Sequence, residues 1–530
     1  MVTVPDFDVI VIGSGPAGVS AAFPLVEAGL KVLMVDGGKQ AEVAPQSRSF
    51  LTERSQNPDQ WKWMIGEDHV ALRNLNAVSP KFRVPALSYA FAEFAAANPI
   101  RADNFVAVGS LARGGLSNAW GCGVARLSAA ELAPFPVAAS DMEQSYARVT
   151  RRIGVSGAQA DDLTEYFGLD AWAQPPIPMD ANHWQIFTRY TSHKQRLAAL
   201  GFRLGRSRVA ALSSDHNRRS ACNLSGNCLW GCHRKALYSA ADELPDLLAH
   251  DTFRYRSGLI VDRIDRSDGR LSIQGRERGR GMSLSATRIV IAAGTLATTR
   301  LALLALETER SVQLLSNPSA AFLLWSPSRL GSPRTDGFGL GQLSFSLDLE
   351  DQVSAFGSTF STVGIPVAEF ARHLPFGRRP AIDLLRSLLS SCLVGNLFLP
   401  GRLSDNAVAL DRDGVLIITG GHAAAVGGLL TLAESRLRKA FWHMRVGLLP
   451  KSFTAVAPGG DIHYAGTLPM RECPVLGETD ANGELAQFGG VHIVDGACLP
   501  TLTEKSHTLT IMANADRIGR AMAMAMQFDP

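Results

Sequence analysis

The sequence lacks the features that mark secreted, nucleic-acid-binding and membrane-spanning proteins. Its seven cysteines are an odd number spread over 530 residues, which does not fit a disulfide framework. The 52 basic and 49 acidic residues leave a formal net charge of only +3, so nucleic acid is not expected as a partner. No stretch reaches the roughly 18–20 uncharged apolar residues that span a bilayer. The nearest, residues 387–400, is too short and lies between Arg386 and Arg402.

Only six residues precede the first predicted strand, and the sequence has few charged residues. The first predicted strand starts at Phe7, so no signal peptide is expected, and we expect a reducing, cytoplasmic location without membrane association. Charged residues make up 19% of the chain and hydrophobic residues 46%, which allows a sizeable core and excludes a disordered chain. The length fits two or three ordinary domains or one large two-lobed enzyme.

A glycine-rich turn near the N-terminus is the strongest signal in the chain. A β-branched strand is followed by Gly13, Gly15 and Gly18, which form G-x-G-x-x-G before a predicted helix. The first glycine allows the tight turn, the second lets the backbone approach a pyrophosphate, and the third lets helix and strand pack closely. A second strand ends at Asp36, whose carboxylate can bind ribose hydroxyls. This order predicts a dinucleotide site and leaves open whether it binds FAD or NAD.

Two further glycine-containing segments extend the predicted nucleotide site. In residues 112–127, adjacent glycines precede Ser117, Asn118 and Trp120. Small residues let the backbone lie against a flat ring system, and the serine and asparagine can form hydrogen bonds with it. Residues 287–303 predict a strand, an Ala-Ala-Gly turn and a helix, as a doubly wound sheet requires.

Two histidines near the C-terminus are candidates for proton transfer. His463 precedes a glycine turn, and His507 stands at the start of the last predicted helix, residues 508–521. The helix dipole disfavours an imidazolium at that end, so we expect a neutral ring. Such a ring can accept a proton from a hydroxyl group or orient that group. His492 falls in a short predicted strand, residues 491–494, and we interpret it as structural.

A cluster of cysteines in the middle of the chain raises the question of a metal site. Cys222, Cys228 and Cys232 lie close together in the sequence, with His233 adjacent. Their C-x5-C-x3-C spacing lacks the C-x2-C pairs that zinc and iron–sulfur sites favour. We therefore expect free thiols here and no metal ion.

Together these motifs resemble those of the glucose–methanol–choline (GMC) flavoprotein oxidoreductases. The resemblance covers the N-terminal glycine motif, the Gly-Gly-Leu-Ser segment, the Ala-Ala-Gly turn and the C-terminal region, in the same order. The segment GGLSNAWGC is most similar to the pyranose-oxidase-like branch. The resemblance implies FAD as the cofactor. It also implies non-covalent binding, because Ala119 stands where some members attach FAD through a histidine.

The resemblance also implies roles for the two histidines. In the family, the histidine of an H-x-x-G-T motif lies by flavin N5 and acts as base toward the alcohol; here it is His463, followed by Gly466 and Thr467. The second catalytic position, a histidine or asparagine before the last helix, falls on Ser506 or His507. We interpret His507 as the catalytic residue.

The residues expected to bind the cofactor come from the glycine motifs and from the resemblance. They are Gly13, Gly15, Pro16, Ala17, Gly18, Asp36, Gly37, Arg113, Gly114, Gly115, Ser117, Asn118, Trp120, Gly121, Val261, Ala293, Gly294, Asp495, Gly496 and Thr508.

The implied fold is α/β. We expect a doubly wound Rossmann-type FAD-binding domain assembled from discontinuous segments, and a substrate domain with a mostly antiparallel sheet. The FAD-binding domain is expected to comprise residues 1–135, 201–310 and 456–530, and the substrate domain residues 136–200 and 311–455. Within the last of these segments, strands are predicted in residues 341–349 and 406–420 and a helix over residues 381–393.

The implied activity is oxidation of a hydroxyl group of a sugar, glycoside or other alcohol to a carbonyl. The proton would pass to His463 and the hydride to flavin N5. A hydrophobic alcohol or a sterol is an alternative substrate. A non-redox lyase on the same FAD fold and an NAD-dependent dehydrogenase are alternative activities. Dioxygen, a quinone and a redox partner protein remain open as electron acceptors.

Overall fold

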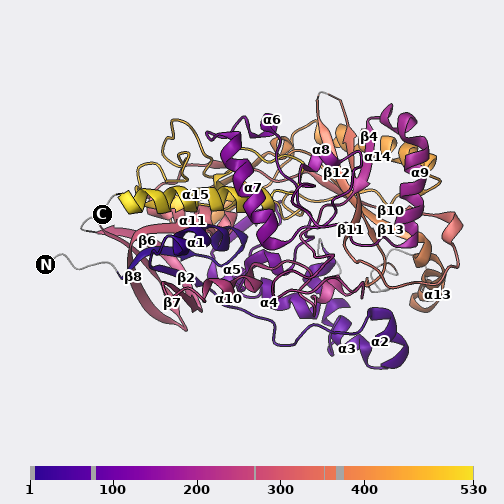
Figure 1. The fold of residues 1–530 in the computed structure, drawn as a ribbon, viewed down its shortest axis with the longest axis horizontal. Coiled ribbons are helices and arrows are strands. Elements are labelled where there is room, and N and C mark those ends of the chain that lie inside the picture. The colour runs from indigo at the N-terminus through magenta and orange to yellow at the C-terminus, as the bar shows by residue number, and fades with distance from the viewer. Residues whose placement is uncertain are drawn as a thin grey trace.

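The chain forms two lobes that lie side by side along the longest axis of the molecule (Figure 1). The structure is a computed structural model and describes residues 6–72, 79–267, 270–350, 352–365, 370, 375 and 377–528. One lobe contains a largely parallel sheet with helices packed on it, and the other contains an antiparallel sheet. The predicted fold class, a Rossmann-type domain with an antiparallel-sheet domain, is thereby confirmed.

The first lobe is built on a sheet of seven described strands. Across the sheet these are β5 (Phe253–Ser257), β2 (Val32–Asp36), β1 (Phe7–Ile12), β8 (Arg280–Ile291), β7 (Arg270–Glu277) and β6 (Leu259–Ser267), with β18 (Val491–Ile493) paired to β8. Strands β5, β2, β1, β8 and β18 are parallel, and β6 and β7 form an antiparallel hairpin beside β8. Val9, Ile10 and Val11 of β1 are fully buried, as expected for a strand covered on both faces.

Helices from the beginning, the middle and the end of the chain belong to this lobe. They are α1 (Pro16–Glu27), α7 (Ala139–Ile153), α10 (Leu244–Leu247), α11 (Thr295–Ala305) and α15 (Thr508–Phe528). The C-terminal α15 lies across the N-terminal α1 (Figure 1). Their close approach requires Gly519, because a Cβ there would lie 2.5 Å from the carbonyl oxygen of Ala21. This contact holds the start of α15 beside the glycine-rich turn.

The second lobe is built on an antiparallel sheet, also of seven described strands. These are β16 (Gly447–Leu448), β10 (Ser319–Trp325), β13 (Cys392–Phe398), β12 (Ser354–Ser361), β11 (Gly341–Asp348) and β4 (Phe202–Arg206), with β17 (Thr454–Ala455) paired to β10. Helices α9 (Ala181–Ala198) and α14 (Val426–His443) pack near it. Four buried rings form the centre of its core: Phe202, Phe322, Phe345 and Phe441.

A smaller sheet and several short helices complete the described structure. The sheet has the order β3 (Ile100–Asp103), β15 (Leu416–Thr419), β14 (Asn406–Leu410) and β9 (Val312–Leu314). The helices are α2 (Phe50–Gln56), α3 (Gln60–Ile65), α4 (Ser88–Phe91), α5 (Phe94–Ala97), α6 (Ala129–Leu132), α8 (Thr164–Phe167) and α13 (Arg378–Leu388). Among the described residues, no helix is both long and apolar enough to cross a membrane; the expected cellular location stays a prediction.

Individual elements cross the domain segments expected from the sequence. Strand β4 lies within residues 201–310 and joins the antiparallel sheet, whereas α7 lies within residues 136–200 and packs on α15. The segment boundaries themselves stay a prediction.

Two predicted helices differ in extent from those observed. The predicted helix over residues 381–393 is wrong beyond Leu388, where α13 ends, because the chain continues into β13 and pairs there with β10 and β12. Leu393 is fully buried in that strand. The last helix continues past residue 521 to Phe528, since the Ala- and Met-rich sequence there favours helix and contains neither glycine nor proline.

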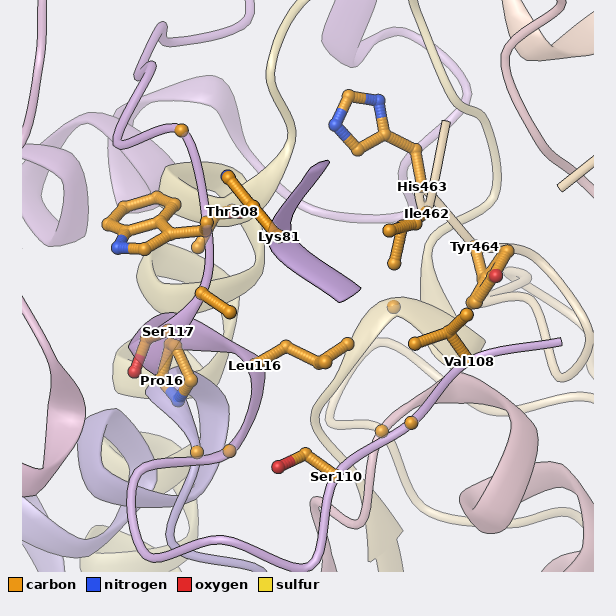
Figure 2. Close-up of a pocket in the computed structure, with 18 of the residues that line it drawn as sticks. Pro16, Lys81, Val108, Ser110, Leu116, Ser117, Ile462, His463, Tyr464 and Thr508 are labelled. Atoms are coloured by element: carbon orange, nitrogen blue, oxygen red, sulfur yellow. The ribbon is translucent and has the colours of Figure 1, made fainter. Parts of the chain in front are cut away.

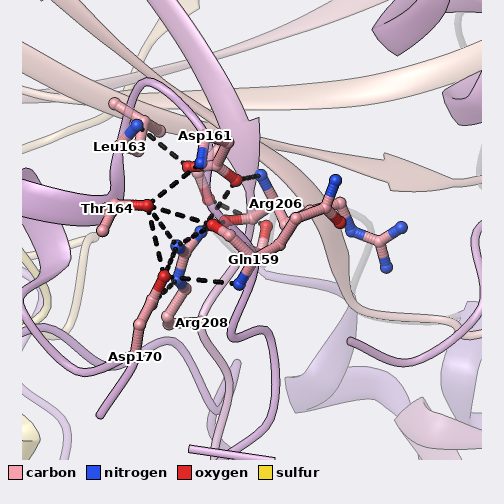
Figure 3. Close-up of polar contacts among 9 residues, drawn as sticks. Gln159, Asp161, Leu163, Thr164, Asp170, Arg206 and Arg208 are labelled. Atoms are coloured by element: carbon pink, nitrogen blue, oxygen red, sulfur yellow. Dashed lines mark hydrogen bonds and ion pairs between the residues drawn. The ribbon is translucent and has the colours of Figure 1, made fainter. Parts of the chain in front are cut away.

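A buried ion-pair network supports the wall between the two lobes (Figure 3). The Arg208 side chain has no solvent exposure, and its guanidinium lies 3.0 Å from an oxygen of Asp161 and 2.7 Å from an oxygen of Asp170. Asp161 also accepts the backbone N–H of Arg206 at 2.8 Å. Removal of one partner from such a pair costs about 3–5 kcal/mol, because the other charge is left buried and unpaired. The network therefore fixes residues 207–209, which line the cavity described below.

Candidate active site

A cavity of about 590 Å³ lies between the glycine-rich turns of the first lobe and the antiparallel sheet of the second. Figure 2 shows Pro16, Ser117 and Thr508 on one side of this space and His463 and Tyr464 on the other. The wall therefore combines the start of the chain, its middle and its end.

Most of the residues predicted to bind the cofactor line this cavity. They are Gly13, Gly15, Pro16, Ala17, Asp36, Gly37, Gly115, Ser117, Trp120, Gly121, Val261, Ala293, Gly294, Asp495, Gly496 and Thr508. Both predicted catalytic histidines also line it. The other four predicted residues, Gly18, Arg113, Gly114 and Asn118, do not line the cavity, and a part for them in cofactor binding stays a prediction.

The glycine motif separates into packing glycines and one that faces open space. A Cβ at Gly13 would lie 2.2 Å from the carbonyl oxygen of Ala292, and a Cβ at Gly18 would lie 1.9 Å from that of Gly13. At Gly15 the backbone has φ −68°, which any residue can adopt. A Cβ there would meet no described atom within 4 Å. Packing therefore does not explain Gly15, and the open space beside it would leave room for a phosphate at the start of α1.

Asp36 is held at the end of β2 by donors from three directions. The Ser14 hydroxyl donates to one carboxylate oxygen, and the other oxygen accepts from the Tyr255 hydroxyl at 2.7 Å and the Gly38 N–H at 2.8 Å. Burial raises the pKa of Asp36, and these hydrogen bonds and the charge of Arg113 act in the opposite direction. The carboxylate reaches the cavity wall, where ribose hydroxyls can bind it.

The Gly-Gly-Leu-Ser turn is braced by its own polar side chains. The Asn118 amide donates to the carbonyl oxygens of Arg113 at 2.9 Å and Gly115 at 2.8 Å, and it accepts from Ser239 at 2.9 Å. The Ser117 hydroxyl donates to the Gly114 carbonyl at 2.5 Å. These bonds shape the turn, and the residues around it form the cavity wall.

Asp495 links the C-terminal segment to the Ala-Ala-Gly turn. One of its carboxylate oxygens accepts from the Gly294 N–H at 2.8 Å and the Thr298 hydroxyl at 2.5 Å, and the other accepts from the Ala497 N–H at 3.0 Å. Burial raises its pKa to about 6. Thr467, the last residue of H-x-x-G-T, is buried and bonded to Thr299 at 2.6 Å, so it supports the fold.

The two predicted catalytic histidines lie side by side although they are far apart in sequence. The ring centres of His463 and His507 are 4.8 Å apart, and the ring planes cross at 75°. Burial lowers the pKa of His507 to about 4. Burial, then His507 and Lys81, lower the pKa of His463 well below its ordinary value. Both rings are therefore neutral near pH 7 and able to accept a proton.

The structure brings the His507 ring, and not the Ser506 side chain, against His463. The His507 carbonyl accepts the N–H of Ile511 at 2.9 Å, which places His507 at the start of α15. Ser506 faces the opposite glycine loop, where its hydroxyl would lie 3.0 Å from a Cβ at Gly123. The choice of His507 for the second catalytic position stays a prediction, and this placement supports it.

Three polar residues of this site were missed in the sequence. Asn317 Oδ1 lies 3.0 Å from His463 Nδ1 and can only accept in that hydrogen bond, and the Asp461 side chain is buried two residues before that histidine. The third residue, Lys81, lines the cavity, and burial lowers the pKa of its amine to about 8. Asp461 stands two residues before the H-x-x-G-T motif and could have been noticed. Asn317 and Lys81 lie in turn-like segments that carry no signal for a shared site.

The cysteines predicted as free thiols are not disulfide-bonded. All seven are free, with Cys122 fully buried at the cavity wall and Cys222, Cys228 and Cys232 partly exposed. Burial raises the pKa of Cys122 to about 12, so it is a neutral thiol. Within the described ranges, no group of three or more His, Cys, Asp or Glu residues has an arrangement that could hold a metal ion.

The chain is similar to one family of oxidoreductases and to two proteins named as oxidases. A family model described as pyridine nucleotide-disulphide oxidoreductase matches residues 7–98. Paromamine 6′-oxidase of Streptomyces fradiae is 25% identical over 98% of this chain and 91% of its own length. The crystal structure of pyridoxine 4-oxidase from Mesorbium loti covers 97% of this chain and 99% of its own, with a TM-score of 0.57 and 14% identity. The last likeness shows a shared fold.

Proposed function

We propose, from the confirmed resemblance to the GMC-type FAD-dependent oxidoreductases, that this chain oxidises a hydroxyl group of a sugar, glycoside or other alcohol to a carbonyl. The observation that carries the proposal is the pair of neutral histidine rings, 4.8 Å apart, in the wall of the same cavity as the glycine turns. A nucleotide site without a base, or a base without a nucleotide site, would not support this reaction.

The chain's residues fit FAD as the cofactor. Gly15 leaves open space at the start of α1, where backbone N–H groups favour a pyrophosphate. Asp36 would bind the adenosine ribose, and the small residues around Ser117 and Gly121 would lie against the ring system. Ala119 also lines the cavity and offers no atom for a covalent link, so we propose non-covalent binding. Bound FAD would supply the acceptor for the substrate hydride.

The two histidines would divide the proton chemistry. His463 would accept the hydroxyl proton as the C–H hydride leaves, so the alcohol loses both hydrogens and becomes a carbonyl. His507 would hold the hydroxyl oxygen in place with a hydrogen bond. Because burial keeps both rings neutral, neither needs to lose a proton before the reaction.

The names of two similar proteins bear on the substrate and on the electron acceptor. The two relatives are named as oxidases of paromamine, at its 6′ position, and of pyridoxine, at position 4. Both names favour a small alcohol over a sterol and dioxygen over a quinone or partner protein. The Lys81 amine at the cavity wall adds a donor that a polar substrate can use.

The test is anaerobic flavin reduction by a panel of sugars, aminoglycosides and small alcohols. A substrate should bleach the flavin absorbance of the wild-type holoenzyme, and dioxygen should then restore it with formation of peroxide. In His463→Ala the reduction rate should fall by about 10²–10⁴-fold, the usual contribution of a general base, while FAD stays bound.

His492→Ala is the matched control. His492 is also buried in the first lobe, and its Nδ1 lies 3.1 Å from the Asn482 carbonyl oxygen, but it does not line the cavity. Its replacement should leave flavin reduction within a few-fold of wild type. Substrate turnover without any bleaching would instead favour a non-redox lyase. Equal reduction rates in wild type and His463→Ala would remove His463 from the mechanism.

A further inference from the structure

We infer that Asn317 is a positioning residue that fixes His463 in the tautomer with its proton on Nδ1, so that Nε2 is the proton-accepting atom. The tautomer is a property of the chain alone. What Nε2 then does with a substrate proton rests on the proposed function.

The orientation of the Asn317 amide is set by two backbone carbonyls. Its Nδ2 lies 2.7 Å from the carbonyl oxygen of Leu399 and 2.9 Å from that of Thr503. Carbonyl oxygens can only accept, so both must face the amide NH₂ group. The backbone N–H of Asn317 is also fixed, since it donates to Asp461 at 2.8 Å. Asn317 is 2% exposed. Hydrogen bonds thus fix both its backbone N–H and its side-chain Nδ2.

The remaining amide atom, Oδ1, faces the histidine. It lies 3.0 Å from His463 Nδ1. Because an amide oxygen only accepts, Nδ1 must carry the proton in this hydrogen bond. Burial, His507 and Lys81 together hold the pKa of His463 low, so the ring is neutral and has a single N–H. Nε2 is then left with a lone pair, as a general base requires.

The other groups around His463 do not compete for Nδ1. Asp461 Oδ2 is 3.8 Å from Nδ1, beyond hydrogen-bond distance. That oxygen already accepts the backbone N–H groups of Asn317 and His463, the latter at 3.3 Å. His507 and Phe398 contact the ring, with ring centres 4.8 and 5.0 Å from that of His463. Lys81 acts on the ring as a nearby cation, which disfavours a second proton.

Asn406 provides a matched control for substitution of Asn317. It is 3% exposed, and its Nδ2 donates to Leu314 and to Ser316, each at 3.0 Å. Its Oδ1 accepts the N–H of Gly421 at 3.0 Å. Asn406→Ala thus removes as many buried hydrogen bonds as Asn317→Ala, from the adjoining part of the fold, without touching a histidine.

The direct test is ¹⁵N NMR of the histidine-labelled holoenzyme, with the His463 signals assigned by their loss in His463→Gln. We expect wild type and Asn406→Ala to show protonated Nδ1 and unprotonated Nε2 at neutral pH. In Asn317→Ala the signals should shift toward the Nε2-protonated form or an average of the two. A wild-type ring protonated on Nε2, or an Asn317→Ala ring that keeps its tautomer, would overturn the inference.

A kinetic readout separates this inference from the proposed function. Asn317→Ala should slow anaerobic flavin reduction at least about tenfold, because the wrong tautomer withholds the base, with little change in apparent substrate affinity. Asn406→Ala should stay within a few-fold of wild type. If the NMR result holds but His463→Ala reduces the flavin at the wild-type rate, the tautomer assignment stands and the proposed function fails.

Discussion

Replacement of Gly15 by alanine should weaken FAD binding while leaving the fold intact. The backbone of Gly15 has φ −68° and ψ 180°, so alanine adopts it without strain. A Cβ there would have no described atom within 4 Å. Gly15 precedes α1 as its N-cap, where alanine is disfavoured relative to glycine by several tenths of a kcal/mol. Alanine also lowers the entropy of the unfolded chain, which stabilises by roughly 0.4–1 kcal/mol.

These two effects nearly cancel, so the apoprotein's free energy of unfolding should change by less than about 0.5 kcal/mol. The added methyl would instead meet the phosphate groups that are expected over this turn. We expect the Kd for FAD to rise at least about tenfold, equivalent to about 1.4 kcal/mol. Denaturant unfolding of the apoprotein and fluorescence titration with FAD measure the two quantities separately.

Alanine substitutions at two other glycines serve as controls for Gly15→Ala. Gly281 in β8 likewise leaves open space for a Cβ but does not line the cavity, so Gly281→Ala should change neither FAD affinity nor the fold by much. Gly18→Ala should disrupt the fold, because its Cβ would lie 1.9 Å from the Gly13 carbonyl oxygen. An unchanged Kd in a folded Gly15→Ala protein would refute the placement of the pyrophosphate over Gly15.

Three further predictions concern the groups around the two histidines. His507→Ala should slow flavin reduction as much as His463→Ala or somewhat less, and Ser506→Ala should have little effect; a larger loss in Ser506→Ala would show that the second catalytic position is Ser506. Lys81→Met removes a cation that lowers the pKa of His463, so the acid limb of the rate of flavin reduction should move to higher pH, and an unmoved limb would exclude this coupling. Burial raises the pKa of Asp461 from 3.8 to about 8, so its contribution to stability is complete below pH 3.8 and is lost as the pH rises through about 8. Asp461→Asn should therefore gain thermal stability relative to wild type between about pH 4 and pH 8, and a constant Tm difference over that range would contradict the raised pKa.

The parts of the site that were predictable from the sequence are those that a short motif encodes by itself. Gly13, Gly15 and Gly18 specify a strand, a turn and a helix within a few residues, and Asp36 follows at the end of the next strand. Such local patterns fix local backbone geometry whatever the remainder of the chain does. The order of several such patterns then predicted the fold class.

The parts that were not predictable depend on contacts between distant segments. Asn317 lies 146 positions from His463, and its Asn-Pro sequence signals only a turn. Its role arises because the carbonyls of Leu399 and Thr503, from two other segments, orient its amide. Lys81 carries no motif at all, and only the folded cavity brings it near His463.

The predicted helix over residues 381–393 extends beyond the observed end of α13 at Leu388 for a different reason. Leucines at helical spacing through residues 381–393 satisfy a helical pattern, but a short apolar run fits a buried strand equally well. Pairing decided the outcome: from Cys392 onward the backbone bonds to β10 on one side and β12 on the other. Leu393, the last residue of the predicted helix, is fully buried in the sheet.

The visible spectrum of the purified protein, before and after acid precipitation, tests whether the protein binds FAD and binds it without a covalent link. We expect flavin absorbance in the native protein and its complete release into the supernatant, because Ala119 offers no covalent attachment. Colour that stays in the pellet would contradict the non-covalent assignment. A colourless protein that takes up no flavin when FAD is added would contradict the proposed function itself.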